Sequence, residues 1–178
     1  MQHPMLVAIS GTPGTGKTAV CEKLRKDGYK VVDLNKLAYD SNSVIGVDPQ
    51  RDVDIVDTDA LKLKVREFEN DLVFLDGHFS HLMDVDVAII LRCNPEELRK
   101  RLEKKQWKES KIRENVEAEA VDAITVESTD SNAETLEIDT TNTSADQTAE
   151  AVIRIVQGER EEFRLGQIDW SEVILDWY

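Results

Sequence analysis

The sequence predicts an α/β domain with three layers, in which a parallel five-stranded sheet lies between two layers of helices. Five short apolar runs, bounded by turn residues, recur along the 178 residues, and helical stretches separate them. The clearest of them, such as MLVAI, are continuously apolar, which is typical of strands that helices cover on both faces. Strands that alternate with helices form parallel sheets with right-handed crossovers. We therefore expect a single domain, residues 1–178, with strands at 5–9, 30–34, 71–76, 85–92 and 135–140.

Two predicted helices have clear end signals. The first begins at Lys17 and ends near Gly28, because glycine readily takes the left-handed conformation that stops a helix. The second opens at Asn94, a capping residue, with Pro95 in its first turn and two acids that suit the positive helix end. Both helices follow a predicted strand.

Three later helices complete the pattern. One runs from about Ser110 through Ile124 on helical spacing, and Ser144 can cap another that leads to Val156. The last is expected in the segment 159–178. One face of that helix would comprise Trp170, Val173, Ile174 and Trp177. We expect this C-terminal helix to dock on the body of the domain, and the alternative is that it binds a partner.

The composition is that of a soluble globular protein, with 40% hydrophobic and 33% charged residues. No apolar run approaches the roughly 18 residues that a membrane span needs, and no basic stretch precedes the first apolar run as in a signal peptide. We therefore expect a cytoplasmic protein. Cys21 and Cys93 lie far apart without metal-ligand spacing, so buried free thiols are expected, with a disulfide or a reactive thiol as the alternative.

The charge is strongly negative and unevenly distributed. A net charge of −14, from 36 acids and 22 bases, argues against direct nucleic-acid binding, which needs a basic face. Acidic groups at this density repel one another unless salt screens them, so we hypothesise that the host cytoplasm has a high salt concentration. A melting temperature that is unchanged or lower in molar KCl would contradict this hypothesis. Residues 99–113 hold eight of the bases, whereas 114–153 hold eleven acids and no base. The basic segment suggests a bound polyanion such as a nucleotide, or alternatively a solvated helix face.

The stretch GTPGTGKT, residues 11–18, fits the phosphate-binding loop of nucleoside triphosphatases in full. Residues without a Cβ, such as Gly11 and Gly16, let backbone N–H groups turn inward around a phosphate. The loop leads into a helix whose first amides and dipole favour anions. Lys17 would reach the β- and γ-phosphates, and the Thr18 hydroxyl would ligate Mg²⁺. We therefore expect this P-loop to bind ATP or another nucleoside triphosphate.

A second magnesium-orienting group is expected at the end of a neighbouring strand. Asp76 closes the strand 71–76, and His78 follows two residues later. From the strand tip the imidazole could orient a water molecule or move a proton. The alternatives are a turn acid for Asp76 and a surface or packed imidazole for His78.

A kinase must also exclude water and hold an acceptor. A basic flap around Trp107 could close over the transferring phosphate. It comprises Arg101, Lys104, Lys105, Lys108, Lys111 and Arg113. The acid-rich stretch 40–59, which we expect to be poor in regular structure, lies where an acceptor-binding insert would fall. Its only base is Arg51, which weakens a purely kinase interpretation.

With these residues, the chain resembles the archaeal proteins called putative adenylate kinases. The resemblance rests on GTPGTGKT, on DGH after the third strand, and on LR followed by RLEKKQWKESKIRENVEAE. It covers roughly residues 5–157 and, more loosely, the terminal helix. These proteins are relatives of the eukaryotic coilin-interacting nuclear adenylate kinase, isoenzyme six, which is also an assembly factor of the small ribosomal subunit.

The resemblance implies roles for matching positions. The contacts to the ATP phosphates fall on Gly14, Gly16, Lys17, Thr18 and Ala19. Asp76 and His78 match the pair that the family links to Mg²⁺ positioning and hydrolysis, and Arg101 matches an arginine directed at the phosphates. Residues from about 34 to 57 correspond to a short NMP-binding region, and about 104 to 114 to the lid, as in adenylate kinases.

Two positions depart from the family pattern. Lys105 stands where the family often has a lid arginine, so a planar two-pronged grip becomes a point charge. Tyr39 stands near the place of an arginine that grips the monophosphate, which puts efficient use of AMP in doubt. The family's partner is a platform protein of the small ribosomal subunit, number eleven in the universal list. Its basic character suits the acidic segment 114–153.

Taken together, these expectations predict an adenylate kinase that converts ATP and AMP to two ADP. We expect it also to hydrolyse ATP with Mg²⁺ and to take part in maturation of the small ribosomal subunit. We expect a monomer or homodimer. One alternative is a nucleotide-switched assembly chaperone whose kinase activity is incidental. The other is a P-loop kinase that phosphorylates a different nucleoside or a small metabolite.

Overall fold

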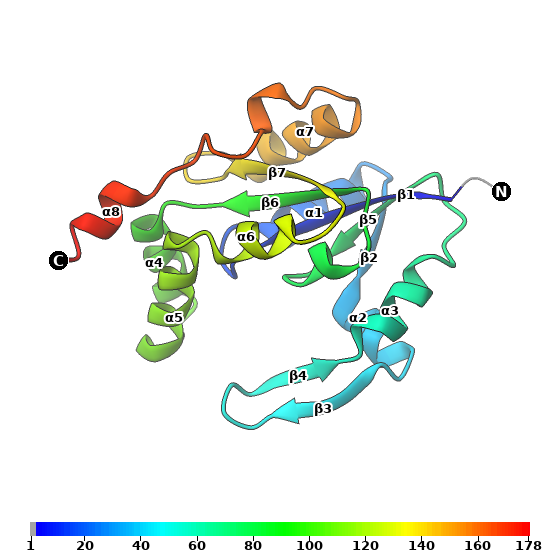
Figure 1. Ribbon diagram of the computed structural model, residues 1–178, viewed down its shortest axis with the longest axis horizontal. Coiled ribbons are helices and arrows are strands. Elements are labelled where there is room, and N and C mark those ends of the chain that lie inside the picture. Colours follow the sequence, from blue (N-terminus) through cyan, green and yellow to red (C-terminus); the bar gives the residue numbers. More distant parts are fainter. Residues whose placement is uncertain (1–2) are drawn as a thin grey trace.

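The computed structural model describes residues 3–178, and its centre is a five-stranded sheet (Figure 1). All neighbouring pairs are parallel, and the strand order is β2-β5-β1-β6-β7. The strands are β1 (Met5–Gly11), β2 (Lys30–Asp33), β5 (Leu72–Asp76), β6 (Val87–Arg92) and β7 (Glu134–Asp139). The predicted three-layer fold with a parallel five-stranded sheet is therefore confirmed, with each strand within a few residues of its expected place.

The register brings the strand ends that matter to one edge of the sheet. Asp76 at the end of β5 pairs with Asp33 of β2 and with Ile9 of β1. On the other side of β1, Gly11 pairs with Leu91 of β6. In open parallel sheets, ligands bind outside the carboxyl ends of the strands, so this edge is where a site is expected.

Helices α1 (Lys17–Lys26) and α7 (Ala145–Val156) cover one face of the sheet. Val7 and Ile9 of β1 point into this layer and are fully buried there. The capping box at the start of α7, in which Ser144 and Gln147 bond reciprocally, confirms the expected cap. The apolar faces of α1 and α7 therefore pack on the sheet and on each other, and this packing also holds the loop that precedes α1 against the sheet.

The opposite face is covered by shorter elements. They are α2 (Leu34–Asp40), α3 (Thr58–Val65), the 3₁₀ turn η1 (Ser80–Leu82) and α6 (Ala123–Thr129). Leu6 and Ala8 of β1 alternate with the residues of the first face and pack here. A third apolar cluster joins α4 (Pro95–Lys104) to α5 (Glu109–Ala120) beyond the edge of the sheet.

The expectation that residues 40–59 lack regular structure is wrong. They contain an antiparallel hairpin of β3 (Val44–Asp48) and β4 (Val53–Val56), followed by the start of α3. The hairpin extends away from the main sheet (Figure 1). Its longest apolar stretches are two residues, Val44-Ile45 and Ile55-Val56, so no apolar run of strand length marks the strands in the sequence.

The single helix expected from Ser110 to Ile124 is two helices in the structure. α5 ends at Ala120 and α6 begins at Ala123, because Asp122 between them adopts the left-handed conformation with φ 57°. The Asp122 carboxylate pairs with the buried guanidinium of Arg92 at the end of β6. An ion pair thus fixes the corner at which the helical pattern breaks.

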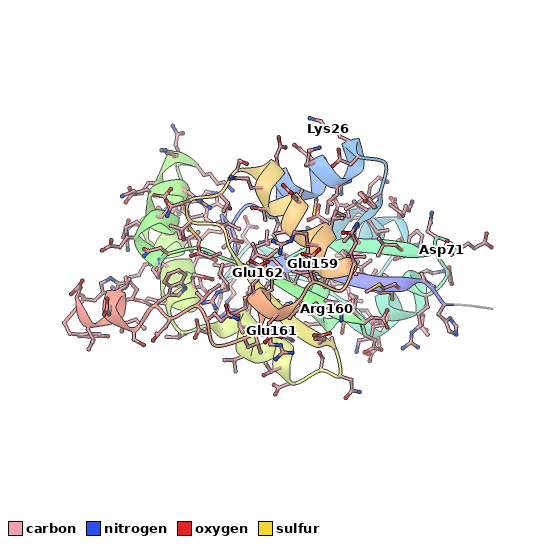
Figure 2. The ribbon with its side chains drawn as sticks, turned by 90° about the horizontal axis from the view of Figure 1, so that it is seen from above. Lys26, Asp71, Glu159, Arg160, Glu161 and Glu162 are labelled. Atoms are coloured by element: carbon pink, nitrogen blue, oxygen red, sulfur yellow. The ribbon has the colours of Figure 1, made fainter. Side chains whose placement is uncertain are left out.

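The segment after α7 lies beside the edge strand β7, where Arg164 forms an antiparallel bridge with Leu136, before it reaches the C-terminus. Residues 159–162 lie together near the end of α7 in Figure 2. Arg154 pairs there with Glu159 at 2.8 Å and also with Glu162, while Arg160 pairs with Glu134 of β7. The chain then continues through η2 (Glu161–Phe163) to α8 (Ser171–Leu175), the helical part of the C-terminal segment.

Two other expectations concern the chain as a whole. Both cysteines, Cys21 and Cys93, are free and buried, as expected, and burial raises the pKa of each thiol. Between residues 3 and 178, the structure contains no helix with the length and apolarity that crossing a membrane requires.

Candidate active site

The P-loop joins β1 to α1, and its glycines meet two different demands. Gly14 has φ +94°, and a Cβ there would lie 2.8 Å from the Leu102 side chain and 2.9 Å from that of Leu98. Gly14 therefore lets the loop pack directly on α4. Gly16 has φ +107° with open space where a Cβ would be, so a ligand can approach its backbone. Gly11 ends β1 so close to β6 that a Cβ would meet the Leu91 carbonyl oxygen.

The Lys17 side chain folds back into the loop. Its ammonium donates to the carbonyl oxygens of Gly11 and Thr12, the latter at 3.1 Å. Burial lowers the pKa of Lys17 to about 8, and the Asp76 carboxylate opposes this shift. A positive charge is therefore held against the inner side of the loop, where it costs free energy until an anion compensates it.

A cavity of about 700 Å³ lies against this loop. Its lining contains all of the expected site residues except Gly11, which lies beneath the loop at the end of β1. The lining residues are Pro13, Gly14, Gly16, Lys17, Thr18, Ala19, Glu22, Arg25, Asp33, Asn35, Asp76, Gly77, His78, Arg101 and Lys105. Residues from four separate parts of the sequence thus surround one space.

Asp76 is partly buried at the tip of β5 and is paired with a base that the sequence interpretation missed. Arg25 of α1 donates to the Asp76 carboxylate at 3.2 Å. Burial raises the pKa of Asp76, and the hydrogen bond from Arg25 opposes that shift. Asp33, the register partner of Asp76 on β2, also lines the cavity. Its position at the end of the neighbouring strand is the signal that could have identified it.

His78 lines the cavity as an exposed side chain, with its ring edge-on to Phe79 at 5.2 Å between centroids. Desolvation lowers the pKa of His78, and the nearby Lys17 ammonium lowers it further, so a neutral ring at pH 7 is expected. The other histidine of this region, His81, is buried between Ser10 at 2.8 Å and Glu127 at 3.1 Å. Only His78 of these two reaches the cavity.

Arg101 is held in place at the edge of the cavity by backbone oxygens. It donates to the carbonyls of Thr140 and Thr141 at 2.8 and 3.1 Å, and to that of Gly14 at 3.4 Å. Lys105, one turn later at the end of α4, lines the same side of the cavity. Both side chains extend from the helix on which the P-loop packs.

The remainder of the predicted basic flap does not line the cavity. Lys111 lies over the Trp107 ring at 4.2 Å from the centroid, and Arg113 pairs with Glu117 on the same helix at 2.7 Å. Tyr39 is also directed elsewhere, because its hydroxyl donates to Asp54 of the hairpin. Of the flap, only Arg101 and Lys105 are brought to the site.

The oxygen donors of the cavity suit magnesium. The Thr18 hydroxyl and the Asp76 carboxylate both face the space beside the P-loop, and Mg²⁺ prefers such hard oxygen ligands together with phosphate oxygens and water. The open backbone at Gly16 and the charge of Lys17 suit a polyphosphate. The residues present therefore fit a magnesium-bound nucleoside triphosphate.

Comparison with known proteins agrees with this geometry. Residues 7–122 match the family model described as an AAA domain. The chain is 43% identical to a protein of Archaeoglobus fulgidus named "Putative adenylate kinase", covering 97% of this chain and 95% of that one. It is 41% identical to a protein of the same name from Pyrococcus abyssi, covering 95% and 93%.

Solved structures show the same fold at lower identity. The protein TT1252 of Thermus thermophilus superposes with a TM-score of 0.59 at 21% identity, covering 89% of this chain and 98% of that one. A shikimate kinase of Acinetobacter baumannii in complex with shikimate gives 0.61 at 14% identity, covering 89% and 96%. With its P-loop, strand order and near full-length relatives, the chain belongs to the family of proteins named putative adenylate kinases.

Proposed function

We propose that this protein is an adenylate kinase that transfers the γ-phosphoryl group of Mg-ATP to AMP and also hydrolyses ATP. The single observation that carries the proposal is the convergence of Lys17, Asp76 and Arg101 on one cavity against the P-loop. The names of the near full-length relatives support the kinase assignment. Phosphoryl transfer needs positioning and charge stabilisation rather than a covalent intermediate, and the charged residues that line this cavity support such a role.

Each residue has a defined task in this proposal. Lys17 and the amides of the P-loop neutralise charge that develops on the β- and γ-phosphate oxygens. Thr18 and Asp76 place Mg²⁺, and Asp76 exchanges its bond with Arg25 for that role. Arg101 and Lys105 supply positive charge on the opposite side of the transferring group.

The acceptor would enter from the side of β2 and α2. Asp33, Asn35 and Arg25 line this part of the cavity. Arg51, at the tip of the hairpin, pairs with Glu114 of α5 at 3.8 Å and is not among the residues that line the cavity. We therefore assign Arg25 to the acceptor phosphate. Its guanidinium becomes available when Asp76 exchanges its bond with Arg25 for the metal.

The test measures ADP formation from Mg-ATP with and without AMP, followed by ³¹P nuclear magnetic resonance. A kinase produces two ADP for each ATP and AMP consumed, at a rate well above hydrolysis alone. If ADP forms at the same rate with and without AMP, the kinase assignment is contradicted. Replacing AMP by other nucleoside monophosphates and by small hydroxylated metabolites separates AMP from another acceptor.

His78 is proposed to order the attacking water in hydrolysis. Its exposed position and lowered pKa support this role, since a neutral imidazole can accept a hydrogen bond from water. In the variant His78→Ala, ATP hydrolysis is expected to fall about a hundredfold while ATP affinity is retained. Unchanged hydrolysis would remove His78 from the mechanism.

A second candidate function is nucleotide-dependent assembly of the small ribosomal subunit through its platform protein number eleven. The acidic segment 114–153 favours it, because eight of its eleven acids are exposed and would attract a basic protein. The buried Glu119 and Glu137 are not available for this purpose. ATP turnover with and without the purified ribosomal protein tests this role. No binding and no change in turnover would reject it.

A further inference from the structure

A buried carboxylate behind the P-loop connects three elements that are distant in sequence. Glu119, near the end of α5, accepts a hydrogen bond from the Thr12 hydroxyl of the P-loop at 2.8 Å. Its other oxygen accepts from the Arg92 guanidinium at 2.7 Å and from the Cys93 backbone N–H at 3.1 Å. One side chain thus holds the loop, the end of β6 and α5 together.

The environment of Glu119 makes these bonds important. The Glu119 and Thr12 residues are only 2% exposed. Burial raises the pKa of Glu119, and Arg92 opposes that shift. A buried carboxylate that lost a donor would be left partly unsatisfied, so the position of Thr12 and the charge of Glu119 depend on each other.

The C-terminal segment reaches the same carboxylate. The indole N–H of Trp170 donates to the Glu119 carboxylate at 3.4 Å. The Arg92 guanidinium carbon lies over the Trp170 ring, 6.0 Å from the ring centroid. Trp170 immediately precedes α8, which contacts α5 although none of the α8 residues is buried. Trp170, more than 150 positions from the P-loop in the sequence, is therefore connected to Thr12 of the loop through two hydrogen bonds to Glu119.

We propose that Glu119 is a positioning residue of the P-loop and that Trp170, by docking on Glu119 and Arg92, couples the C-terminal segment to nucleotide binding. This inference rests on the proposed ATP site. A nucleotide bound at the loop fixes the position of Thr12, and the Thr12 hydrogen bond then fixes the orientation of the Glu119 carboxylate. That carboxylate is the acceptor for the Trp170 indole N–H, so nucleotide binding stabilises the docked position of Trp170. By linkage, docking of the segment strengthens nucleotide binding by the same factor that nucleotide strengthens docking.

Glu137 offers a matched control for Glu119. It is also buried and also pairs with Arg92, but its other partner is Thr125, away from the P-loop. Glu119→Gln is expected to weaken binding of a non-hydrolysable Mg-ATP analogue about fivefold, whereas Glu137→Gln leaves the affinity within about twofold. Calorimetry gives the affinities, and thermal melting of both variants measures the shared loss of stability. Equal affinities in the two variants would overturn the proposal.

The indole signals provide a second test that does not depend on a buried substitution. The chain has three tryptophans, and Trp→Phe variants assign their ¹H–¹⁵N indole peaks. Titration with the same analogue is expected to shift the Trp170 peak but not that of Trp177, which lies in the same segment. Trp170→Phe keeps a ring over Arg92 and loses the hydrogen bond, so affinity should fall about threefold, while Trp177→Phe should not change it.

The outcomes separate this inference from the proposed function. If the wild-type protein binds no Mg-ATP analogue, the ATP site itself is wrong. If it binds the analogue and forms ADP from AMP, but the Trp170 peak stays fixed and Trp170→Phe binds normally, only the coupling is wrong. A shifted Trp170 peak that no longer responds in Glu119→Gln supports the full connection.

Discussion

The P-loop side and the hairpin side of the molecule are built differently. Around the P-loop, Thr12 and Thr15 are almost fully buried, and their polar groups bond to α5, to the loop itself and to the turn after β7. On the hairpin side, β3 and β4 leave Ile45 67% and Ile55 45% exposed. An isolated two-stranded hairpin is only marginally stable, so the hairpin depends on few contacts with the rest of the domain.

The two sides therefore differ in how firmly their groups are positioned. Groups that must meet a fixed phosphate geometry are held by a packed core and by buried hydrogen bonds, which resist displacement. The hairpin carries the exposed apolar side chains of Ile45 and Ile55, and none of its residues is among those that line the cavity. We infer that the P-loop side is preorganised and that the hairpin side is held less firmly.

The largest expected effect comes from the charge in the P-loop. Lys17→Ala should lower the affinity for the Mg-ATP analogue about a thousandfold, because two charge-assisted hydrogen bonds to phosphate are lost. Lys23→Ala is the control on the same helix, since Lys23 pairs with Asp27 on the surface. Calorimetry measures both. Retained affinity in Lys17→Ala would contradict the site on which the comparison is built.

Matched truncations of apolar residues test the contrast in packing. Leu98 on α4 is fully buried beside the P-loop, so Leu98→Ala should lower the free energy of unfolding by about 3 kcal/mol. Ile45→Ala on the hairpin should cost less than about 1 kcal/mol, because its side chain is mostly exposed already. Denaturant unfolding measures both values. A similar cost at the two positions would erase the difference between the two sides.

Two glycines with similar backbone angles separate packing from conformational strain. Gly14 has φ +94°, and leucine side chains lie within 3 Å of the place that a Cβ would take, whereas Gly28 has φ +92° and open space. Gly28→Ala should cost about 1 kcal/mol of stability for the left-handed conformation alone. Gly14→Ala should cost about 2 kcal/mol more through overpacking against α4. Equal losses in thermal melting would show that the loop does not rest tightly on α4.

The pH dependence of nucleotide affinity is the smallest and sharpest test. Burial lowers the pKa of Lys17 to about 8 in the free protein, and bound phosphate would keep its proton to higher pH. Binding then takes up a proton, so affinity should fall by up to about tenfold per pH unit above pH 8. In the free protein, stability should fall through this group as pH drops from 10.5 toward 8, because the unfolded chain binds that proton more tightly than the native one.

Calorimetry in buffers of different ionisation enthalpy checks the proton uptake directly. The observed heat should depend on the buffer at pH 9 and should not at pH 6.5, where Lys17 is protonated in both states. A buffer-independent heat at pH 9 would contradict the lowered pKa.

The sequence was informative where one physical demand fixed the residue type. Short apolar stretches between helical segments predicted all five sheet strands, and the spacing of Gly11, Gly16 and Lys17 predicted the P-loop. The grouping of Asp76, His78, Arg101 and Lys105 around one cavity also followed the expectation, although their chemical roles stay predictions.

Other features depend on contacts between distant residues, which a local pattern does not contain. The hairpin was missed because it has no apolar stretch longer than two residues and none of its strand residues is fully buried. The helix break at Asp122 is set by Arg92, 30 residues away. Arg25 enters the site through helix packing, so its sequence neighbourhood did not identify it. Asp33 enters through strand register, and its place at the end of a predicted strand was the one sequence signal for it.

The two buried thiols have a practical consequence. With their ionisation suppressed by the surrounding protein, Cys21 and Cys93 should react with alkylating reagents only when the chain opens. Cys21 lies in α1 and Cys93 follows β6, so the two sites report on separate parts of the native structure. The rate of alkylation at each, read by mass spectrometry, would then resolve local fluctuations without any introduced label.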